Sequence, residues 1–315
     1  MCRCIVVLKI RDNSATIVVS AQYGALGAAL ILTDHALDGS NSYIFEAADN
    51  QVQRTPYGHI RHALLYKTFF WYWVRRSLVT RYRQTSLGWL WALLQPLLSS
   101  LIYVIIFTVI IPVPTGNVPY PLFIITDLVF WSYFSRVVLI GAGSITNNID
   151  LLTRIQFPRE FLPLAVWVES LVDLLLGLCI VAAAFLLYQY PLTAFAPLVL
   201  VAFVVETMLA LGLAFLLASM SVIVRDLMQV VPLLMQLLVY LSPVIYPLTS
   251  VPKGLQSVLA FNPLSAVFAT YQETLFYGQF TVGGSLLLGA VISAVILVGG
   301  YLTFKRVEWQ FADLR

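Results

Sequence analysis

Charged residues are scarce in this chain of 315 residues. Only 10% of the positions are charged and 60% are hydrophobic, whereas a soluble domain usually carries about 25% charged residues. The mean hydropathy is +0.88. This composition excludes an ordinary soluble domain and predicts an integral membrane protein. The net charge of +3 is small and gives no indication of nucleic-acid binding.

Reactive side chains are equally few. The three cysteines cannot form a disulfide framework, and the three histidines (His35, His59 and His62) precede all the long apolar runs. No metal-ligand spacing therefore occurs in those runs. The sequence has no Gly-x-Ser-x-Gly turn, and it has no P-loop because it lacks any Gly-Lys dipeptide. We predict no catalytic residue, no metal and no cofactor, so that any ATP driving this protein binds to a partner.

One long apolar run sets the orientation of the chain. Residues 88–111 contain no charged residue, and as a helix they would extend roughly 36 Å, enough to cross a hydrocarbon core of about 30 Å. Four arginines lie shortly before this run: Arg75, Arg76, Arg81 and Arg83. Because cationic residues collect on the cytoplasmic side of membrane spans, we expect the helix to enter from the cytoplasm.

The other apolar runs bring the number of expected spans to six. Sixteen Lys and Arg residues lie on segments predicted to be inside and only Lys253 lies outside, which is a strong positive-inside signal. Both termini are therefore predicted to be cytoplasmic, in a multi-pass protein of the cytoplasmic (inner) membrane. The expected fold is an all-α membrane domain over residues 84–315, with spans at about 88–111, 122–144, 162–188, 195–224, 227–247 and 283–304.

The residues before the first span divide in two. Residues 1–58 are an N-terminal extension of uncertain structure: a poor signal sequence, a seventh span, a small β-rich or disordered unit and a misassigned start site all remain open, and we favour a cytoplasmic extension. Residues 59–83 alternate apolar and cationic residues at helical spacing, which predicts an amphipathic helix along the cytoplasmic membrane surface. Its four arginines either only anchor the helix or also bind an anionic headgroup, such as a lipid-linked phosphate.

Charged side chains also fall inside the predicted spans, where they are expected to face the bundle interior. Glu169 and Asp173 are four residues apart and share a helix face. Arg136 lies at a depth similar to that of Asp173, so we predict that these two pair, either to fix the helix register or to take part in gating. The intramembrane charges singled out are Arg136, Glu169, Asp173 and Glu206.

The longest segment predicted to be external follows the fifth span. It contains two apolar pieces, residues 255–261 and 265–277, which are each too short to cross the membrane. Asn262 and Pro263 separate them. This pattern predicts a pair of re-entrant or interfacial helices.

Four stretches of the sequence resemble the permease subunit of ABC-2 type exporters for polysaccharides, a group that moves O-antigen, capsule or teichoic acid chains. The resemblance covers about residues 60–315, with the stretches in the same order and spacing. The stretches are RYRQTSLGWLWALLQPLL (81–98), IQFPREFLPLAVWVESLVDLLL (155–176), VRDLMQVVPLLMQLLVYLSPVIYPLTSVP (224–252) and FNPLSAVFATYQETLFYG (261–278).

The resemblance implies a role for several segments. Residues 59–83 would be the interface helix, and the split external segment would be the gate-helix pair. The inside loop after the second span would hold the coupling helix that docks on an ATPase subunit. Two copies of this chain and two ATPase subunits would make the working unit, with the channel between the two permeases. The residues expected to contact the ATPase are Asp150, Leu151, Leu152 and Arg154.

The function expected from this resemblance is export of a lipid-linked polysaccharide, with an undecaprenyl-linked glycan as the substrate. Tyr103 and Phe107 share a face of the first span, where they either stack on sugar rings in the channel or pack in the core. A drug or lipid efflux permease of the same class is the nearest alternative. An alternative of another class is a membrane-embedded transferase acting on polyprenyl phosphates. Such an enzyme would require acidic metal-binding motifs on an inside loop.

Overall fold

The computed structural model forms two compact units, Met1–Leu64 and Leu65–Arg315, which are considered separately below. Within them, the residues that the structure describes are 4–9, 16–21, 30–34, 70–81, 90–110, 112–149, 152, 157–224, 226–252, 254, 256, 259 and 261–308.

The first unit contains a three-stranded antiparallel sheet in the order β1-β2-β3. Its strands are β1 (Cys4–Lys9), β2 (Thr16–Ala21) and β3 (Leu30–Asp34). The register places Val19 of β2 opposite Val6 of β1 on one side and Leu32 of β3 on the other. Residues 17–21 and 30–32 belong to β2 and β3, within the extension for which a seventh span was one of the alternatives left open above. The all-α expectation therefore omitted this small sheet, which matches the β-rich alternative.

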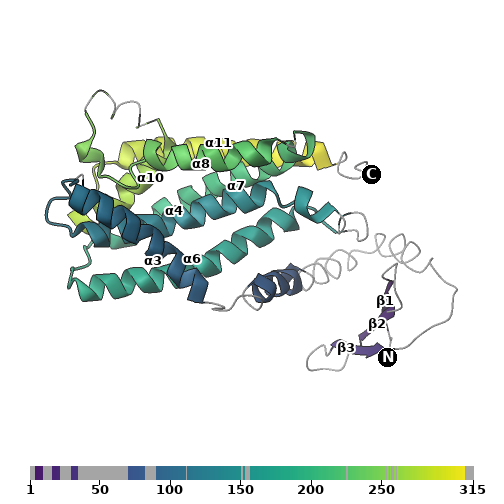
Figure 1. The fold of residues 1–315 in the computed structure, drawn as a ribbon. Coiled ribbons are helices and arrows are strands. Elements are labelled where there is room, and N and C mark those ends of the chain that lie inside the picture. The colour runs from purple at the N-terminus through teal and green to yellow at the C-terminus, as the bar shows by residue number, and fades with distance from the viewer. Residues whose placement is uncertain are drawn as a thin grey trace. The chain divides into compact units, whose positions relative to one another are not determined.

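The second unit is a bundle of helices, preceded by a separate helix at residues 70–81 (Figure 1). In Figure 1 the long helices lie side by side. They are α3 (Leu90–Ile105) with its π-helical continuation η1 (Ile106–Ile110), α4 (Tyr120–Ala142), α6 (Phe161–Leu187), η3 (Ala196–Leu198) leading into α7 (Val199–Ile223), α8 (Leu227–Leu241), α10 (Pro263–Gln272) continued by η5 (Glu273–Tyr277), and α11 (Gly283–Val307), with short 3-10 turns η2 (Thr146–Asn148) and η4 (Leu248–Ser250).

Four of these helices are long and apolar enough to cross a membrane: Tyr120–Ala142, Phe161–Leu187, Ala196–Ile223 and Gly283–Val307. They correspond to the second, third, fourth and sixth predicted spans. Shorter apolar helices, Leu97–Ile110 and Leu227–Leu241, stand where the first and fifth spans were expected. The described residues thus establish a multi-pass helical membrane protein with four helices of spanning length.

The fifth predicted span, 227–247, is too long by six residues. The helix α8 ends at Leu241, and Ser242 is extended, with φ of −111° and ψ of 144°. A residue that precedes proline avoids the helical conformation because the proline ring clashes with its backbone, and Pro243 follows Ser242 directly. Pro243 therefore ends the helix instead of kinking it, whereas Pro232 lies inside α8.

Glycine allows α7 and α11 to approach very closely. A Cβ added to Gly212 of α7 would lie 2.6 Å from the backbone nitrogen of Leu297, and one added to Gly300 of α11 would overlap the Gly212 carbonyl oxygen. In a membrane, small residues bring helix backbones into van der Waals contact where the hydrophobic effect cannot drive association. The two helices therefore pack backbone against backbone.

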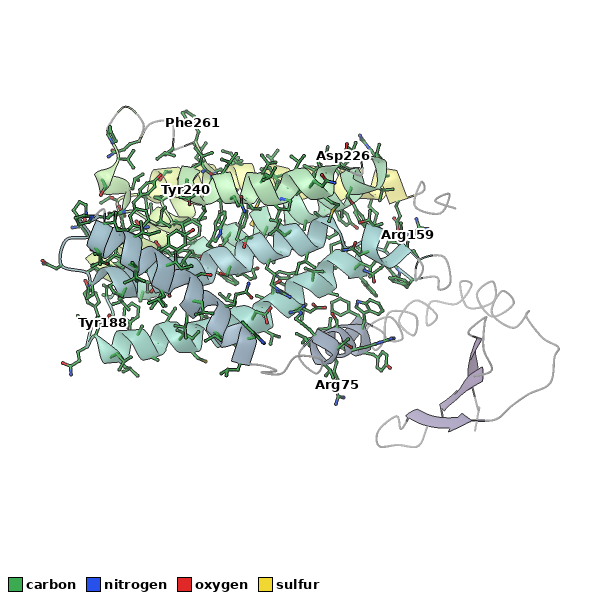
Figure 2. All side chains as sticks on the ribbon, in the orientation of Figure 1. Arg75, Arg159, Tyr188, Asp226, Tyr240 and Phe261 are labelled. Atoms are coloured by element: carbon green, nitrogen blue, oxygen red, sulfur yellow. The ribbon has the colours of Figure 1, made fainter. Side chains whose placement is uncertain are left out.

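The side chains labelled in Figure 2 distinguish the two ends of this bundle. Arg159 and Asp226 lie at one end, and Tyr188 and Phe261 lie at the other. The first end joins the chain segments predicted to be cytoplasmic, and we call it the basic end because Arg159, Lys305 and Arg306 occur there. The second end, which we call the loop end, carries residues 112–119, 188–196, 242–252 and 261–262.

Candidate functional site

The helix at residues 70–81, which we call the surface helix, has one face against the bundle. Val74 is only 2% exposed, and the rings of Phe70 and Phe161 of α6 meet edge to face at 5.3 Å between centroids. Residues 70, 74, 77 and 81 recur at helical spacing and are buried or half-buried. Trp71 is 54% exposed, and Phe70 makes the contact with α6. The opposite face of the helix presents Arg75 (Figure 2).

Arg81, at the end of this helix, is paired with two carboxylates of α6. Its guanidinium forms an ion pair with Glu169 and a second one with Asp173 at 3.1 Å. Arg136 of α4 contacts the same Asp173 carboxylate, Nε to Oδ2, at 2.9 Å. The predicted pair between Arg136 and Asp173 is therefore confirmed, and Arg81 joins it from a third helix. We call Arg81, Arg136, Glu169 and Asp173 the charge cluster.

The charge cluster contains two positive and two negative groups. Ser77 adds a side-chain hydrogen bond to Glu169, so the surface helix makes three polar contacts with α6. Charge-assisted hydrogen bonds in a partly buried site contribute to stability and also constrain the relative positions of the groups that they join. The cluster therefore holds the surface helix, α4 and α6 in one arrangement.

The four arginines predicted to bind an anionic headgroup fall into separate environments. Arg75 and Arg76 are exposed, whereas Arg81 belongs to the charge cluster, with its side chain 27% exposed. Arg83 lies outside the described residues. A guanidinium that already contacts two carboxylates has less of its charge to offer an anion. Arg75 and Arg76 are thus the better placed of the described arginines for a headgroup.

A cavity of about 270 Å³ lies beside the charge cluster. Arg81, Arg136 and Glu169 line it together with Trp73 of the surface helix and Ser144 at the end of α4. The Ser144 hydroxyl is buried and has no hydrogen-bond partner among the described residues. A polar cavity of this size, with an unsatisfied hydroxyl, can hold ordered water or a small polar group.

The loop predicted to couple to an ATPase is described only in part. Asp150, Leu151 and Arg154 lie outside the described residues. Leu152 is half-buried against a small apolar cluster at the basic end, which contains Phe215 of α7 and Phe304 of α11 among others. The one described residue of this predicted contact set therefore packs against the bundle.

The residues that follow this loop are tied to the end of α11. Lys305 bonds the Glu160 carboxylate at 2.8 Å and Glu308 at 3.1 Å, and Arg159 donates to the backbone carbonyl of Glu308. The described part of the predicted coupling loop and the residues that follow it are thus both linked to the bundle, since Leu152 packs against the apolar cluster that contains Phe215 and Phe304. A displacement of the loop would reach α6 and α11 together.

The two aromatic residues predicted to face the channel are half-buried at the loop end of the bundle. The rings of Tyr103 and Phe107 stack with 6.3 Å between centroids, and Phe107 lies 6.0 Å from the ring of Tyr120 in α4. The hydroxyl of Tyr103 hydrogen-bonds with Tyr240 of α8. Both residues therefore contribute to packing between α3, α4 and α8, and their expected contact with a glycan stays a prediction.

Sequence reasoning missed the partners of the deepest carboxylates. Glu206 of α7 accepts a hydrogen bond from the Tyr271 hydroxyl at 2.7 Å, and Asp127 of α4 accepts one from the Gln272 amide at 2.7 Å. All four side chains are buried. The signal available in the sequence was the pair of polar residues, Tyr271 and Gln272, within the piece 265–277, which is too short to cross the membrane.

The comparison with protein families agrees with this architecture. Residues 68–276 match the model of the ABC-2 type transporter family. The chain belongs to this family. The match begins just before the surface helix and ends within η5, so it includes the charge cluster and α10.

Individual relatives of this ABC-2 chain align over most of their length. An O-antigen export system permease protein, RfbA of Myxococcus xanthus, is 33% identical over 244 residues, which are 76% of this chain and 92% of the relative. RfbA of Klebsiella pneumoniae is 25% identical over 240 residues, with the same two shares. The polysialic acid transport protein KpsM of Escherichia coli is 27% identical over 236 residues, 74% of this chain and 91% of KpsM.

Proposed function

We propose that this chain is the membrane-spanning permease subunit of an ATP-driven exporter of a lipid-linked polysaccharide. The observation that carries the proposal is the 33% identity to an O-antigen export permease over 92% of that relative. Membership of the ABC-2 family and the helical bundle support it. The chain has no Gly-Lys dipeptide and hence no P-loop, so a separate ATPase supplies the energy.

The proposed topology has six spans in the inner membrane, with both termini on the cytoplasmic side. The charge distribution supports this orientation because the basic end of the bundle carries Arg159, Lys305 and Arg306. Two copies of the chain and two ATPase subunits form the unit, and the channel lies between the copies. In this orientation α3 and its continuation η1, with the half-buried Tyr103 and Phe107, border the path of the glycan.

The coupling step is proposed to act at the loop 149–157. Asp150, Leu151, Leu152 and Arg154 provide the contact with the ATPase. The links from Arg159 and Glu160, just before α6, to Glu308 and Lys305 at the end of α11 support this role, because they connect the residues after the loop to the bundle. Movement of the ATPase would therefore be transmitted to α6 and α11.

The substrate's phosphate is proposed to bind the surface helix at Arg75 and Arg76, and Arg83, which lies outside the described residues, is proposed to contribute as well. Both described arginines are exposed, and a guanidinium binds phosphate through two parallel hydrogen bonds. Arg81 holds the helix in place through the charge cluster. An undecaprenyl-linked glycan fits this arrangement because its pyrophosphate lies at the headgroup layer while its lipid remains in the bilayer.

Deletion of the gene tests the proposal. We expect undecaprenyl-linked glycan to accumulate on the cytoplasmic side and surface glycan to disappear, with both restored by the full-length chain. Complementation should fail when the ATPase encoded with it carries an inactive nucleotide site. Unchanged surface glycan in the deletion strain would contradict the proposal, and altered drug resistance in that strain would favour the efflux alternative.

A further inference from the structure

The helix α10 is the most enclosed element of the bundle. Every residue from Leu264 to Gln272 is buried, although the ten residues of α10 are too few to cross a membrane. Asn262 caps its start by accepting a hydrogen bond from the backbone nitrogen of Leu264 at 3.1 Å. Figure 1 shows α10 within the loop end of the bundle, among the long helices. A short helix in this place closes that end of the bundle.

Two consecutive side chains of α10 attach it to two different helices. The Tyr271 hydroxyl donates to Glu206 of α7 at 2.7 Å, and the Gln272 amide donates to Asp127 of α4 at 2.7 Å. Successive residues of a helix point about 100° apart, so one turn of α10 reaches both neighbours. The Gln272 amide also donates to the carbonyl of Pro243, after α8, at 2.6 Å.

Only one oxygen of each carboxyl group takes part in these bonds. Oε1 of Glu206 and Oδ1 of Asp127 are buried and have no hydrogen-bond partner among the described residues. Burial of a carboxyl group with incomplete hydrogen bonding is unfavourable. An apolar side chain at either position would pack without this cost, so the two acids are poorly explained as ordinary core residues. Their bonds to α10 are the specific interactions that distinguish them.

The ring of Tyr271 is fixed as well as its hydroxyl. Phe130 of α4 stacks on it with 4.1 Å between centroids and an interplanar angle of 20°, and Phe268 meets it edge to face at 5.9 Å. Replacement of Tyr271 by phenylalanine would therefore keep the ring in place and remove only the hydroxyl. This separates the hydrogen bond from the packing.

We propose that Glu206 and Asp127 are positioning residues that hold α10 across the loop end of the bundle as a closed barrier. The proposal rests on the proposed function, in which the loop end faces the outside and α10 with η5 belongs to the gate-helix pair. Glu206 acts through Tyr271, and Asp127 acts through Gln272. Loss of either bond leaves the fold intact and lets α10 open more often.

Ser265 offers a reporter of that opening. It lies on α10, is buried, and its hydroxyl has no partner among the described residues. The substitution Ser265→Cys, made in the full-length chain with the three native cysteines changed to serine, places a thiol on the barrier. A membrane-impermeant maleimide added to spheroplasts then measures how often this thiol is exposed to the outside.

The variants distinguish the effect of losing the hydrogen bond between Tyr271 and Glu206 from a general loss of stability. We expect Tyr271→Phe and Glu206→Leu to raise the labelling rate about tenfold, as loss of one buried hydrogen bond changes an opening equilibrium by roughly that factor. Glu206→Gln keeps an acceptor for the tyrosine and should stay within about twofold of the parent. The double variant Tyr271→Phe/Glu206→Leu should not exceed the faster single variant, because both remove the same bond.

The matched control is Tyr246→Phe, which removes a hydroxyl that donates to the backbone carbonyl of Tyr240 at 2.8 Å and bonds no described residue of α10. It should leave the labelling rate unchanged. Parent-like labelling in Tyr271→Phe, at a normal protein level in the membrane, would overturn the proposal even if Glu206→Leu fails to accumulate. The assay needs no glycan, so it stands or falls separately from the export measurement on the deletion strain.

Discussion

Arg136 and Asp173 join α4 to α6 through an ion pair of 2.9 Å from Nε to Oδ2. The two residues lie 37 positions apart in the sequence, on antiparallel helices, at matching depth. Asp173 simultaneously accepts Arg81 from the surface helix. One carboxylate is therefore shared by two guanidinium groups from two other elements, and this sharing determines how substitutions at the three positions should behave.

Neutralisation of one partner in this ion pair should destabilise the protein more than neutralisation of both. We expect Arg136→Gln or Asp173→Asn alone to cost about 2 kcal/mol, less than for fully buried pairs because both side chains are partly exposed. The double variant Arg136→Gln/Asp173→Asn should be less destabilised than the sum of the singles. Thermal unfolding in detergent measures this, and strict additivity would show that the two charges do not interact.

Substitution of Arg81 should lower stability, whereas substitution of the exposed Arg75 and Arg76 should leave it almost unchanged. Arg81→Gln removes a partner of Glu169 and Asp173, so we expect a lower unfolding temperature. Arg75→Gln together with Arg76→Gln, on the exposed face, should change stability by about 0.5 kcal/mol or less and should reduce the amount of anionic lipid that the detergent-purified protein retains. Equal loss of retained anionic lipid in the Arg81→Gln variant would show that its guanidinium remains available to phosphate.

Two neighbouring glycines of α11 make a matched pair. Gly300→Ala forces a methyl group into the Gly212 carbonyl, and overpacking of this kind costs about 1–3 kcal/mol. Gly299→Ala meets no atom within 4 Å and should be neutral or stabilising by up to about 1 kcal/mol, because alanine favours a helix more than glycine does. The unfolding temperatures of the two variants test the close packing of α7 and α11, and similar values would contradict it.

Phe107→Leu distinguishes packing from glycan contact. Leucine keeps an apolar side chain beside Tyr120 but offers no flat ring to a sugar. If Phe107 lines the glycan path, export should fall severalfold at an unchanged protein level. If Phe107 only packs between α3 and α4, export should follow the amount of protein in the membrane, and an immunoblot beside the surface-glycan assay decides between these results.

The long spans were readable from the sequence because apolar runs of spanning length are local signals. Asn262 and Pro263 likewise marked a helix start, since one supplies the cap and the other suits the first helical turn, and α10 begins there. The pair between Arg136 and Asp173 followed from counting depth along two spans. These expectations needed only the position of residues along their own helices.

Contacts that depend on how helices are rotated and tilted against one another escaped prediction. Arg81 lies 88 positions from Glu169, and nothing in the sequence states that the surface helix ends against α6. Tyr271 reaches Glu206 across 65 positions for the same reason. The end of α8 was missed for a local reason, because Ser242 was counted within an apolar run although Pro243 follows it.

The links between Lys305, Glu160 and Glu308 bear on the handling of this protein in the laboratory. If the chain were truncated after Phe304 to attach an affinity tag, Lys305, which bonds Glu160 at the start of α6, would be lost. A purified sample of such a truncated chain would keep most of its helix content while the end of α11 is no longer linked to Glu160. Tags placed beyond Arg315 avoid this defect.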